Sequence, residues 1–337
     1  MAPDSDSPER IMQFAWGFAP PLTIEVAVRN RVFDFLDAAP HTVEEVAEYA
    51  KGSPRGWRAV LNCLAGIGLL TKESLRYRTT PESSMYLVTA KPSYRGGLFK
   101  HISTQLIPSW LNLDEIVRIG KPEGRVNDRE TGEEFFAEFV NDLFPLSYPA
   151  VNALGLYLNL KEATSEVRVL DIATGSGVWG IGLAQQSEHV QVSAVDWPLV
   201  LKVTRQMTDR FGLTSRFEFL AGDILEVDFP DKCDVATLGH ILHSEGETRS
   251  RALLKKVNQA LKPGGTIAIA EFTPNSDRTG PPQSLIFAVN MLVNTDAGDT
   301  YPFEQVSSWL EEAGFANARE LPSAGPAPLI LANRRPT

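Results

Sequence analysis

The sequence predicts an α/β chain in which a smaller helical domain precedes a doubly wound, mostly parallel sheet. Two observations lead to this fold class. From residue 167 onward, apolar β-branched runs alternate with amphipathic helical patterns joined by short turns, which is typical of a parallel sheet covered on both faces. Before residue 95, apolar residues recur at helical spacing and a short hairpin follows them.

The second part is organised around residues 167–197, which read as strand, glycine turn, helix and strand. The turn Gly175-Ser-Gly177-Val-Trp-Gly180 follows the apolar run that starts at Val167, and Asp196 ends the next strand. An acidic residue about 20 positions after the first glycine is how a nucleotide cofactor is held. The pattern therefore predicts a cofactor site here.

Asp171 distinguishes between two kinds of cofactor. It lies inside the first strand, where a buried carboxylate would repel the pyrophosphate of a dinucleotide. S-adenosylmethionine has an ammonium, a sulfonium and no phosphate, so the sequence favours it over NAD. An NAD-dependent oxidoreductase stays open as an alternative because the GxGxxG spacing also describes NAD sites.

Composition limits the partners. The chain has 337 residues, a net charge of −10 and a pI near 5.1, which argues against nucleic acid or an anionic membrane as partner. Two distant cysteines, Cys63 and Cys233, indicate reduced thiols. The N-terminus lacks an apolar signal region, no apolar run approaches the length of a membrane span, and no His, Asp or Cys cluster has metal-ligand spacing. We expect a soluble, cytoplasmic protein without a metal.

Three domains are expected: a winged-helix dimerisation domain at 1–95, a helical connector at 96–165 and the cofactor-binding domain at 166–337. Pro20-Pro21 separates a short helix from a longer one that continues to Leu36, and Thr42-Val-Glu-Glu45 is a capping box. Ser53-Pro54 begins a further helix, and residues 69–79 form a hairpin. A winged helix raises DNA binding as an alternative. The chain is acidic, however, and the helix that would enter the groove offers only Arg55 and Arg58, so a homodimer is favoured.

The connector carries aromatic residues that are candidates for the roof of a substrate pocket: Phe136, Phe139 and Tyr148. Residues 120–132 are polar and are expected to form a loop. Further on, strands are expected at 217–221, 235–241, 266–272 and 328–333, and helices at 199–211, 247–261, 283–294 and 303–313. Five polar residues fall at or near the carboxyl ends of the strands, which predicts a single site: Asp171, Asp196, Asp223, His243 and Glu271.

With these motifs in hand, the chain resembles the S-adenosylmethionine-dependent small-molecule O-methyltransferases of secondary metabolism, the group of the hydroxyindole, caffeate and polyketide enzymes. LDIATGSG is similar to their cofactor motif, with Ala173 and Thr174 in place of the usual glycines, and VDWP, AGDIL and LKPGG match the motifs after the next strands. The resemblance implies a Rossmann-like class I methyltransferase domain, an N-terminal dimerisation domain and S-adenosylhomocysteine as product.

The resemblance also implies roles for single residues. Asp196 would hold the ribose, Asp223 the adenine amino group, and Asp171 would lie behind the methionine moiety. The cofactor-binding set is completed by Ala173, Gly175, Gly177, Trp197, Gly222, Ile224 and Gly239. His243 falls where the family has its catalytic base and Glu271 where it has the acid that orients the base, although Ser244-Glu245 replaces the usual Asp-Trp.

The mechanism expected from these residues is an in-line methyl transfer to a hydroxyl of a small aromatic or polyketide-like molecule. His243 would accept the hydroxyl proton, Glu271 would stabilise the imidazolium, and Asn290 or Asn294 would hold the acceptor. His240, three residues earlier, is the alternative base. The same fold with N- or C-methyl transfer, or with chemistry other than methyl transfer, stays a further alternative.

Overall fold

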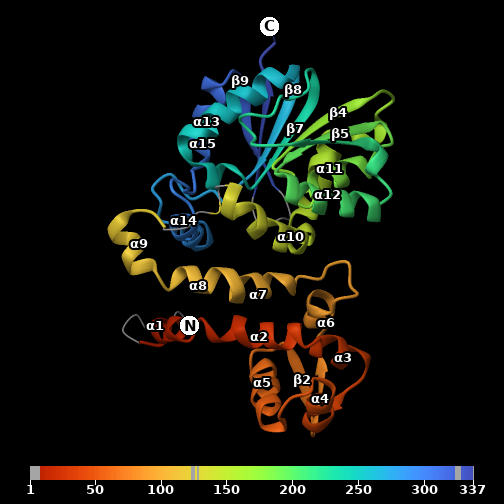
Figure 1. The fold of residues 1–337 in the computed structure, drawn as a ribbon, viewed down its shortest axis with the longest axis vertical. Helices are drawn as coiled ribbons and strands as arrows, with labels where there is room; N and C mark the ends of the chain where they lie inside the picture. The colour runs from red at the N-terminus through yellow and green to blue at the C-terminus, as the bar shows by residue number, and fades with distance from the viewer. Residues whose placement is uncertain (1–7, 123–125, 127–128, 323–327, 337) are drawn as a thin grey trace. The chain divides into compact units, whose positions relative to one another are not determined.

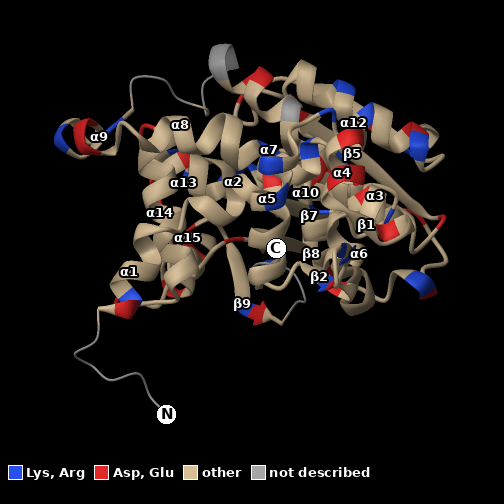
Figure 2. Cartoon of the chain, turned by 90° about the horizontal axis from the view of Figure 1, so that it is seen from below, with Lys and Arg blue, Asp and Glu red and all other residues tan. Residues whose placement is uncertain are grey.

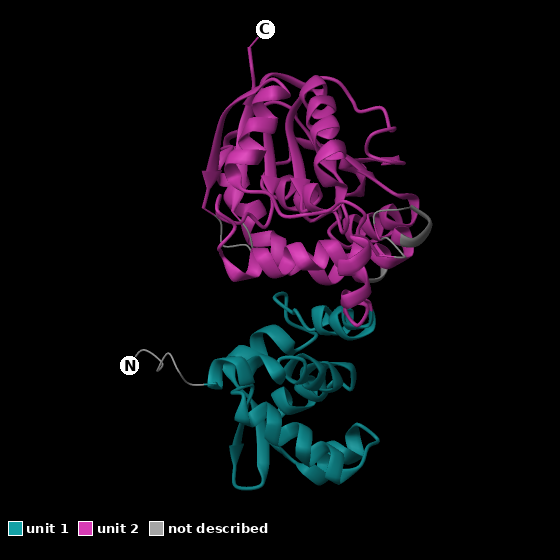
Figure 3. Cartoon of the chain, turned by 90° about the vertical axis from the view of Figure 1, so that its left-hand side faces the viewer, with its two compact units in different colours: residues 1–108 teal, residues 109–337 magenta. Residues whose placement is uncertain are grey.

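The computed structural model describes residues 8–122, 126, 129–322 and 328–336. These residues form two compact units, 1–108 and 109–337 (Figure 3). The sequence predicted three domains, with boundaries after residues 95 and 165. These boundaries stay a prediction.

The first unit is mainly helical. Its core is built from apolar residues of the second to sixth helices and of two strands, and includes Phe33, Leu36, Leu61 and Leu64, which are almost completely buried. Three short antiparallel strands join in the order β1-β3-β2. The elements are α1 (Glu9–Ala15), α2 (Ala19–Arg29), α3 (Val32–Ala38), β1 (His41–Thr42), α4 (Val43–Tyr49), α5 (Pro54–Gly66), β2 (Leu70–Glu73), β3 (Arg76–Thr79), α6 (Pro81–Leu87), α7 (Gly97–His101) and the π-helical turn η1 (Ile102–Leu106), followed by α8 (Ile107–Trp110) across the division.

Local sequence signals explain most of these boundaries. The predicted capping box is present, because Thr42 Oγ1 accepts a hydrogen bond from the Glu45 N–H and Glu45 Oε2 accepts one from the Thr42 N–H. The prediction of one long helix that continues to Leu36 is wrong, because two helices occupy this stretch. Arg31 adopts a left-handed backbone with φ of 56°, so the chain ends α2 at Arg29 and starts α3 at Val32.

Residues Glu9–Arg29 are, among the described residues, the stretch long and apolar enough to cross a membrane by length and composition, with mean hydropathy 1.2. The sequence expectation did not identify this stretch. It contains two helices, α1 and α2, and Ile24 and Ala27 of α2 belong to the buried core of the first unit.

The second unit is a seven-stranded sheet flanked by helices (Figure 1). The strand order is β6-β5-β4-β7-β8-β10-β9; the first five strands are parallel, and β10 is antiparallel to both β8 and β9. The elements are α9 (Leu113–Ile119), α10 (Arg129–Tyr157), η2 (Leu160–Glu162), β4 (Val167–Ile172), α11 (Val178–Ala184), β5 (Val190–Asp196), α12 (Pro198–Arg210), η3 (Thr214–Arg216), β6 (Phe217–Ala221), β7 (Cys233–Gly239), α13 (Leu242–Ala260), β8 (Leu261–Ala270), α14 (Pro282–Asn294), α15 (Phe303–Glu312), β9 (Phe315–Leu321) and β10 (Leu329–Arg334).

Each face of the sheet has its own apolar core. One core joins the strands to α10, α11 and α12, and the other joins them to α13 and α15. Because both faces are covered, the central strands are apolar on both sides, as in residues 169–172 of β4, which are all buried. The predicted doubly wound sheet is confirmed.

Three local predictions differ from the structure. Residues 129–132, expected in a loop, begin the 29-residue helix α10, while residues 123–125 and 127–128 of that loop lie outside the described residues. Strand β8 starts at Leu261 rather than 266, because the Lys262-Pro-Gly-Gly265 segment forms an irregularity within the strand, with Gly264 at φ of 78°. Strand β9 was not expected; Gly314, at φ of 96°, ends α15 and lets the chain reverse into this antiparallel edge strand.

Charged residues of both signs are interspersed over the helices (Figure 2). On α13, for example, Arg251 pairs with Glu247 one turn earlier and with Glu312 of α15. Such exposed pairs contribute little to stability, typically about 0–1 kcal/mol each.

Candidate active site

The glycine turn lies where β4 meets α11, at the carboxyl end of the parallel strands. Gly175 and Gly177 have positive φ of 57° and 79°, and a Cβ at Gly177 would come within 2.9 Å of Thr204 Cγ2. The turn is tied to its neighbours, because the Thr174 N–H donates to Val195 O at 3.1 Å and Thr204 Oγ1 donates to Gly175 O at 2.7 Å. Ala173 also has positive φ, 51°, which is uncommon for a residue with a side chain.

Asp171, in strand β4, is hydrogen-bonded to this turn. Its carboxyl group is completely buried and accepts hydrogen bonds from Thr174 Oγ1 at 2.6 Å, the Gly180 N–H at 3.0 Å and Thr237 Oγ1 at 2.8 Å. Burial raises the pKa of Asp171 to about 6, while these three hydrogen bonds act in the opposite direction. The structure therefore gives Asp171 protein partners on both oxygens, and its contact with a cofactor stays a prediction.

Asp196 ends β5 beside the turn. It accepts hydrogen bonds from the Gly175 N–H at 2.9 Å and from the Trp197 N–H at 2.8 Å, one on each carboxyl oxygen. Burial raises the pKa of Asp196 to about 7, against the effect of these two bonds. The same residue is linked to the next strand, because the Gly222 N–H donates to Asp196 O at 3.0 Å. This places Asp196, the last residue of β5, beside the loop that carries Asp223.

Asp223 follows β6 and is held by an arginine that the sequence analysis missed. Arg249 Nη2 lies 3.0 Å from Asp223 Oδ1 and 2.8 Å from Oδ2, and the Leu225 N–H donates to Oδ1 at 2.8 Å. Arg249 also pairs with Glu245, at 2.5 Å. Ile224, the next predicted cofactor residue, is buried in the core beneath this loop.

His243 and Glu271 form the second part of the site, after β7 and β8. His243 Nδ1 lies 2.6 Å from Glu271 Oε2, and Glu271 Oε1 accepts the N–H of Leu242 at 2.7 Å and of His243 at 3.3 Å. Burial of Glu271 opposes its charged form, but the charge of His243 and its hydrogen bonds hold the pKa of that carboxyl below its ordinary value. Glu271 is thus a buried acceptor that fixes both the backbone and the ring of His243.

His240 lies beside this pair. It has a left-handed backbone, φ of 62°, and its Nδ1 is buried without a hydrogen-bond partner among the described residues. Burial lowers the pKa of His240 to about 4, so its ring is neutral at pH 7. The preceding residue, Gly239, has no room for a side chain, because a Cβ there would come within 2.0 Å of Trp179 Nε1.

One group among the described residues could hold a metal ion. His240, His243 and Glu271 each offer a ligand atom, and these atoms lie within 4.8 Å of one another. Sequence spacing missed the group because Glu271 reaches it from a different strand. The short contact between His243 and Glu271 is that of a hydrogen-bonded donor and acceptor. The absence of a metal stays a prediction.

The predicted substrate residues fall in different places. Phe136 and Phe139 lie near each other, and the Phe136 ring lies 6.1 Å from that of Trp197, the residue after Asp196. Tyr148 is not brought to the site. Its hydroxyl donates to Gln185 Oε1 at 2.6 Å, at the end of α11 opposite the glycine turn.

Asn290 and Asn294 lie one turn apart on α14. Asn290 Oδ1 accepts hydrogen bonds from Trp110 Nε1 at 2.9 Å and from Asn294 Nδ2 at 3.1 Å. Asn294 is buried and also donates to Asn290 O at 2.8 Å. Asn290 is therefore oriented by its neighbours, and Asn294 acts within the protein rather than at an open surface.

Two further aromatic residues line the histidine pair. The Phe287 ring lies 4.8 Å from that of His243 in an edge-on arrangement, the Phe272 ring lies 5.1 Å from that of His240, and the two phenylalanine rings are 4.3 Å apart. The sequence contained a signal for both, since Phe272 directly follows Glu271 and Phe287 lies one helical turn before Asn290.

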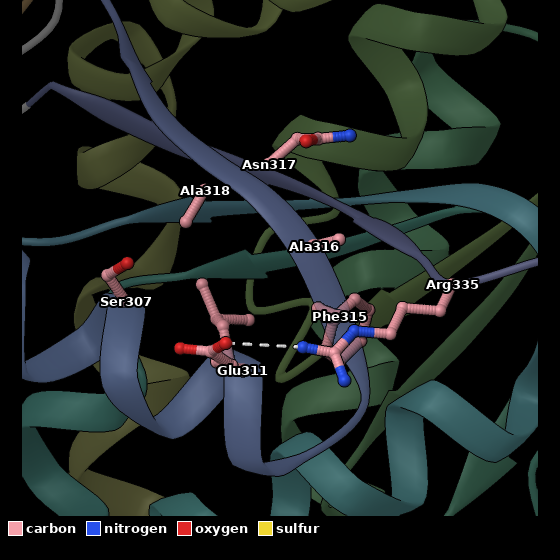
Figure 4. Close-up of a pocket in the computed structure, with 8 residues that line it drawn as sticks. Ser307, Glu311, Phe315, Ala316, Asn317, Ala318 and Arg335 are labelled. Atoms are coloured by element: carbon pink, nitrogen blue, oxygen red, sulfur yellow. Dashed lines mark hydrogen bonds and ion pairs between the residues drawn. The ribbon is translucent and has the colours of Figure 1, made fainter.

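A different pocket lies at the outer edge of the sheet. Figure 4 shows it beside β9, with the ion pair of Glu311 and Arg335 at 3.4 Å across it. It contains none of the predicted site residues. Its lining is Ser307, Leu310, Glu311, Phe315, Ala316, Asn317, Ala318 and Arg335.

The fold and the site together define an enzyme that binds a nucleotide-like cofactor on a doubly wound sheet, with a histidine–glutamate pair at the same edge. Comparison with known proteins narrows this class. Residues 152–316 match the model of the O-methyltransferase domain, and residues 12–89 match that of the O-methyltransferase dimerisation domain.

Individual proteins agree with these matches. A 3-hydroxy-5-methyl-1-naphthoate 3-O-methyltransferase from Streptomyces sahachiroi is 28% identical, with 96% of this chain and 94% of the relative covered. The crystal structure of a putative O-methyltransferase from Nostoc punctiforme has a TM-score of 0.89 at 26% identity, covering 98% of this chain and 100% of that one. Human N-acetylserotonin methyltransferase, solved in complex with S-adenosylmethionine, has the same fold, with a TM-score of 0.87 at 23% identity, covering 99% and 100%.

The chain belongs to the S-adenosylmethionine-dependent O-methyltransferases, with both the catalytic and the dimerisation domain of that family. The expected family, fold class, enzyme class and cofactor are confirmed, and the oxidoreductase and DNA-binding alternatives are set aside. The roles of single residues are not tested by these comparisons.

The contacts of Asp171 predict its effect on stability. In Asp171→Ala, three buried donors lose their acceptor, and since each unsatisfied group costs about 1–3 kcal/mol, we expect the free energy of unfolding to fall by more than about 3 kcal/mol. Asp171→Asn keeps acceptors for most of these donors and should lose about 1 kcal/mol. Urea unfolding measures both, and exposed Asp231→Ala should stay within about 0.5 kcal/mol of wild type. Equal stability of all three variants would contradict this role.

Proposed function

We propose that this enzyme methylates a hydroxyl group of a planar aromatic, polyketide-like metabolite, with His243 as general base. The observation that carries the proposal is the contact between His243 Nδ1 and Glu271 Oε2. With Nδ1 donating its proton to Glu271, His243 presents Nε2 as the atom that accepts a proton. A carboxylate partner also stabilises the imidazolium that forms.

The cofactor is assigned to the residues around the glycine turn. They fit it, because the part-exposed Gly175 leaves its backbone without a side chain, and the carboxyl group beside it, that of Asp196, suits hydroxyl groups and would repel a pyrophosphate. Asp196 would accept the ribose hydroxyls and Asp223 the adenine amino group. When bound, S-adenosylmethionine supplies the methyl group from its sulfonium.

The acceptor is assigned to the edge where the histidines lie. Phe272 and Phe287 provide flat apolar surfaces beside His240 and His243, which suits an aromatic ring whose hydroxyl points to His243 Nε2. Asn290, oriented by Trp110, provides a polar contact on the same helix as Phe287. The substrates named for two similar proteins, a hydroxynaphthoate and acetylserotonin, each have fused aromatic rings that carry a hydroxyl group.

We further propose a homodimer formed through the first unit. The matched dimerisation domain supports it, as do apolar side chains of α1 and the turn after it that are largely exposed in one chain, among them Ile11 at 73%, Phe14 at 73% and Trp16 at 67%. Analytical ultracentrifugation should give twice the chain mass, and Phe14→Asp with Trp16→Asp should give the monomer. A wild-type monomer at micromolar concentration would contradict this. A cytoplasmic location stays a prediction.

The base assignment predicts the kinetics of histidine variants. His243→Asn should lower kcat by about 10²–10⁴-fold, the usual contribution of a general base, with S-adenosylhomocysteine affinity unchanged. His240→Asn should lower kcat much less, because that ring is not held by Glu271. Turnover of a hydroxynaphthoate and calorimetric titration with S-adenosylhomocysteine measure the two quantities. If His240→Asn abolished turnover while His243→Asn did not, the base would be His240.

Asp196 predicts how cofactor affinity depends on pH. Its pKa is raised to about 7, and only the ionised carboxylate can accept hydrogen bonds from both ribose hydroxyls. The proton must therefore leave on binding, so affinity for S-adenosylhomocysteine should rise by about 30-fold between pH 5.5 and 8. Asp196→Asn should bind weakly with a flat pH profile. A flat profile in the wild type would show that Asp196 is ionised throughout or does not bind the ribose.

A further inference from the structure

The helical turn that carries His243 is separate from the helix it precedes. Gly246 interrupts α13 with φ of 74° and ψ of 166°, so residues 242–245 form one turn and the regular helix starts after it. A Cβ at Gly246 would come within 2.7 Å of Ala297 O, so the break needs glycine. Contacts other than helix continuity must hold the His243 turn in place.

Glu245 provides one such contact at the end of this turn. Its side chain is only 7% exposed and lies 2.5 Å from Arg249 Nε, on the first turn of the regular helix. Burial raises the pKa of Glu245, and Arg249 acts against that effect. A buried carboxylate is costly unless it is paired, so Arg249 is needed to keep Glu245 where it is. Together with Ser244, Glu245 occupies the two positions after the base.

The same arginine reaches the cofactor side of the site. Its Nη2 contacts both oxygens of Asp223, 26 residues earlier in the chain. A second basic residue of α13 fixes the same loop, since Lys256 Nζ donates to Ile224 O at 3.1 Å and to Val227 O at 2.5 Å. The loop after β6 and the His243 turn are thus joined through one guanidinium group with two carboxylate partners.

We propose that Arg249 is a positioning residue that couples the adenine end of the cofactor site to the turn carrying His243. The inference rests on the proposed function, in which Asp223 meets adenine and His243 is the base. When adenine binds at Asp223, the contact between Asp223 and Arg249 changes. The ion pair between Arg249 and Glu245 then changes as well, and with it the orientation of His243. Coupling of this kind is reciprocal: changes at Glu245 must also change cofactor affinity.

Calorimetry and NMR test the coupling without an acceptor. The probe is S-adenosylhomocysteine, with S-inosylhomocysteine, which lacks the adenine amino group, as comparison ligand. Arg249→Met and Glu245→Gln should each weaken S-adenosylhomocysteine binding at least fivefold and reduce the preference for it over the inosyl ligand. Arg249→Lys keeps the positive charge but loses the planar guanidinium group that contacts two carboxylates at once. Its affinity for S-adenosylhomocysteine should lie between that of these two variants and that of the wild type. The imidazole resonances of His243 should shift on saturation with ligand in the wild type and not in Arg249→Met.

Arg251→Met is the matched control, since Arg251 lies two residues along the same helix and also pairs with two carboxylates, Glu247 and Glu312. It should bind both ligands as the wild type does. Wild-type affinity in Glu245→Gln, or a wild-type response of His243 in saturated Arg249→Met, would overturn the coupling alone. Failure of the wild type to bind S-adenosylhomocysteine would overturn the proposed function as well. Circular dichroism of each variant identifies loss of folding, and Glu245→Gln then decides the outcome if Arg249→Met does not fold.

Discussion

One buried carboxyl group, that of Asp171, joins the parts on which the candidate cofactor site is built. It lies in the central strand β4 and binds the glycine turn through Thr174, the helix α11 through the Gly180 N–H, and the neighbouring strand β7 through Thr237. Strand β7 leads directly into His240 and His243. The relative positions of the cofactor turn and the candidate base therefore depend on a group that lies outside both of them, because it fixes the two strands and the turn to one another.

The surroundings of the two histidines show how one cluster gives its members different properties. Glu271 contacts both the ring and the backbone N–H of His243, whereas His240 Nδ1 has no hydrogen-bond partner among the described residues. Burial lowers the pKa of His240 to about 4, so that its ring is neutral at pH 7. His240 and His243 therefore differ because Glu271, in the loop after β8, forms its hydrogen bond with the ring of His243.

Local patterns were enough to predict the sheet and much of the site. Val167 to Asp196 contains the strand, turn and second strand in one continuous segment, so its chemistry follows from neighbours in sequence. Contacts across the chain were not predictable in this way. In the sequence, Arg249 is one of two arginines of the helix expected at 247–261, and only the fold brings Asp223 to it. Tyr148 was placed at the site only because aromatic residues recur along the connector. Strand β9 was missed because its alternation is weak, and only its pairing with β10 makes it a strand.

His240 combines two features that each make the folded state less stable. A residue with a side chain in a left-handed backbone is strained. The buried ring nitrogen Nδ1, which has no partner within the described part of the chain, has also lost its bonds to water. A search for more heat-resistant variants of this enzyme should therefore reach position 240 early, through glycine for the backbone or an apolar side chain for the ring. The free energy of unfolding and kcat of such variants would then be compared. A gain in stability with a loss of kcat would show that His240 is kept for turnover at a cost to stability.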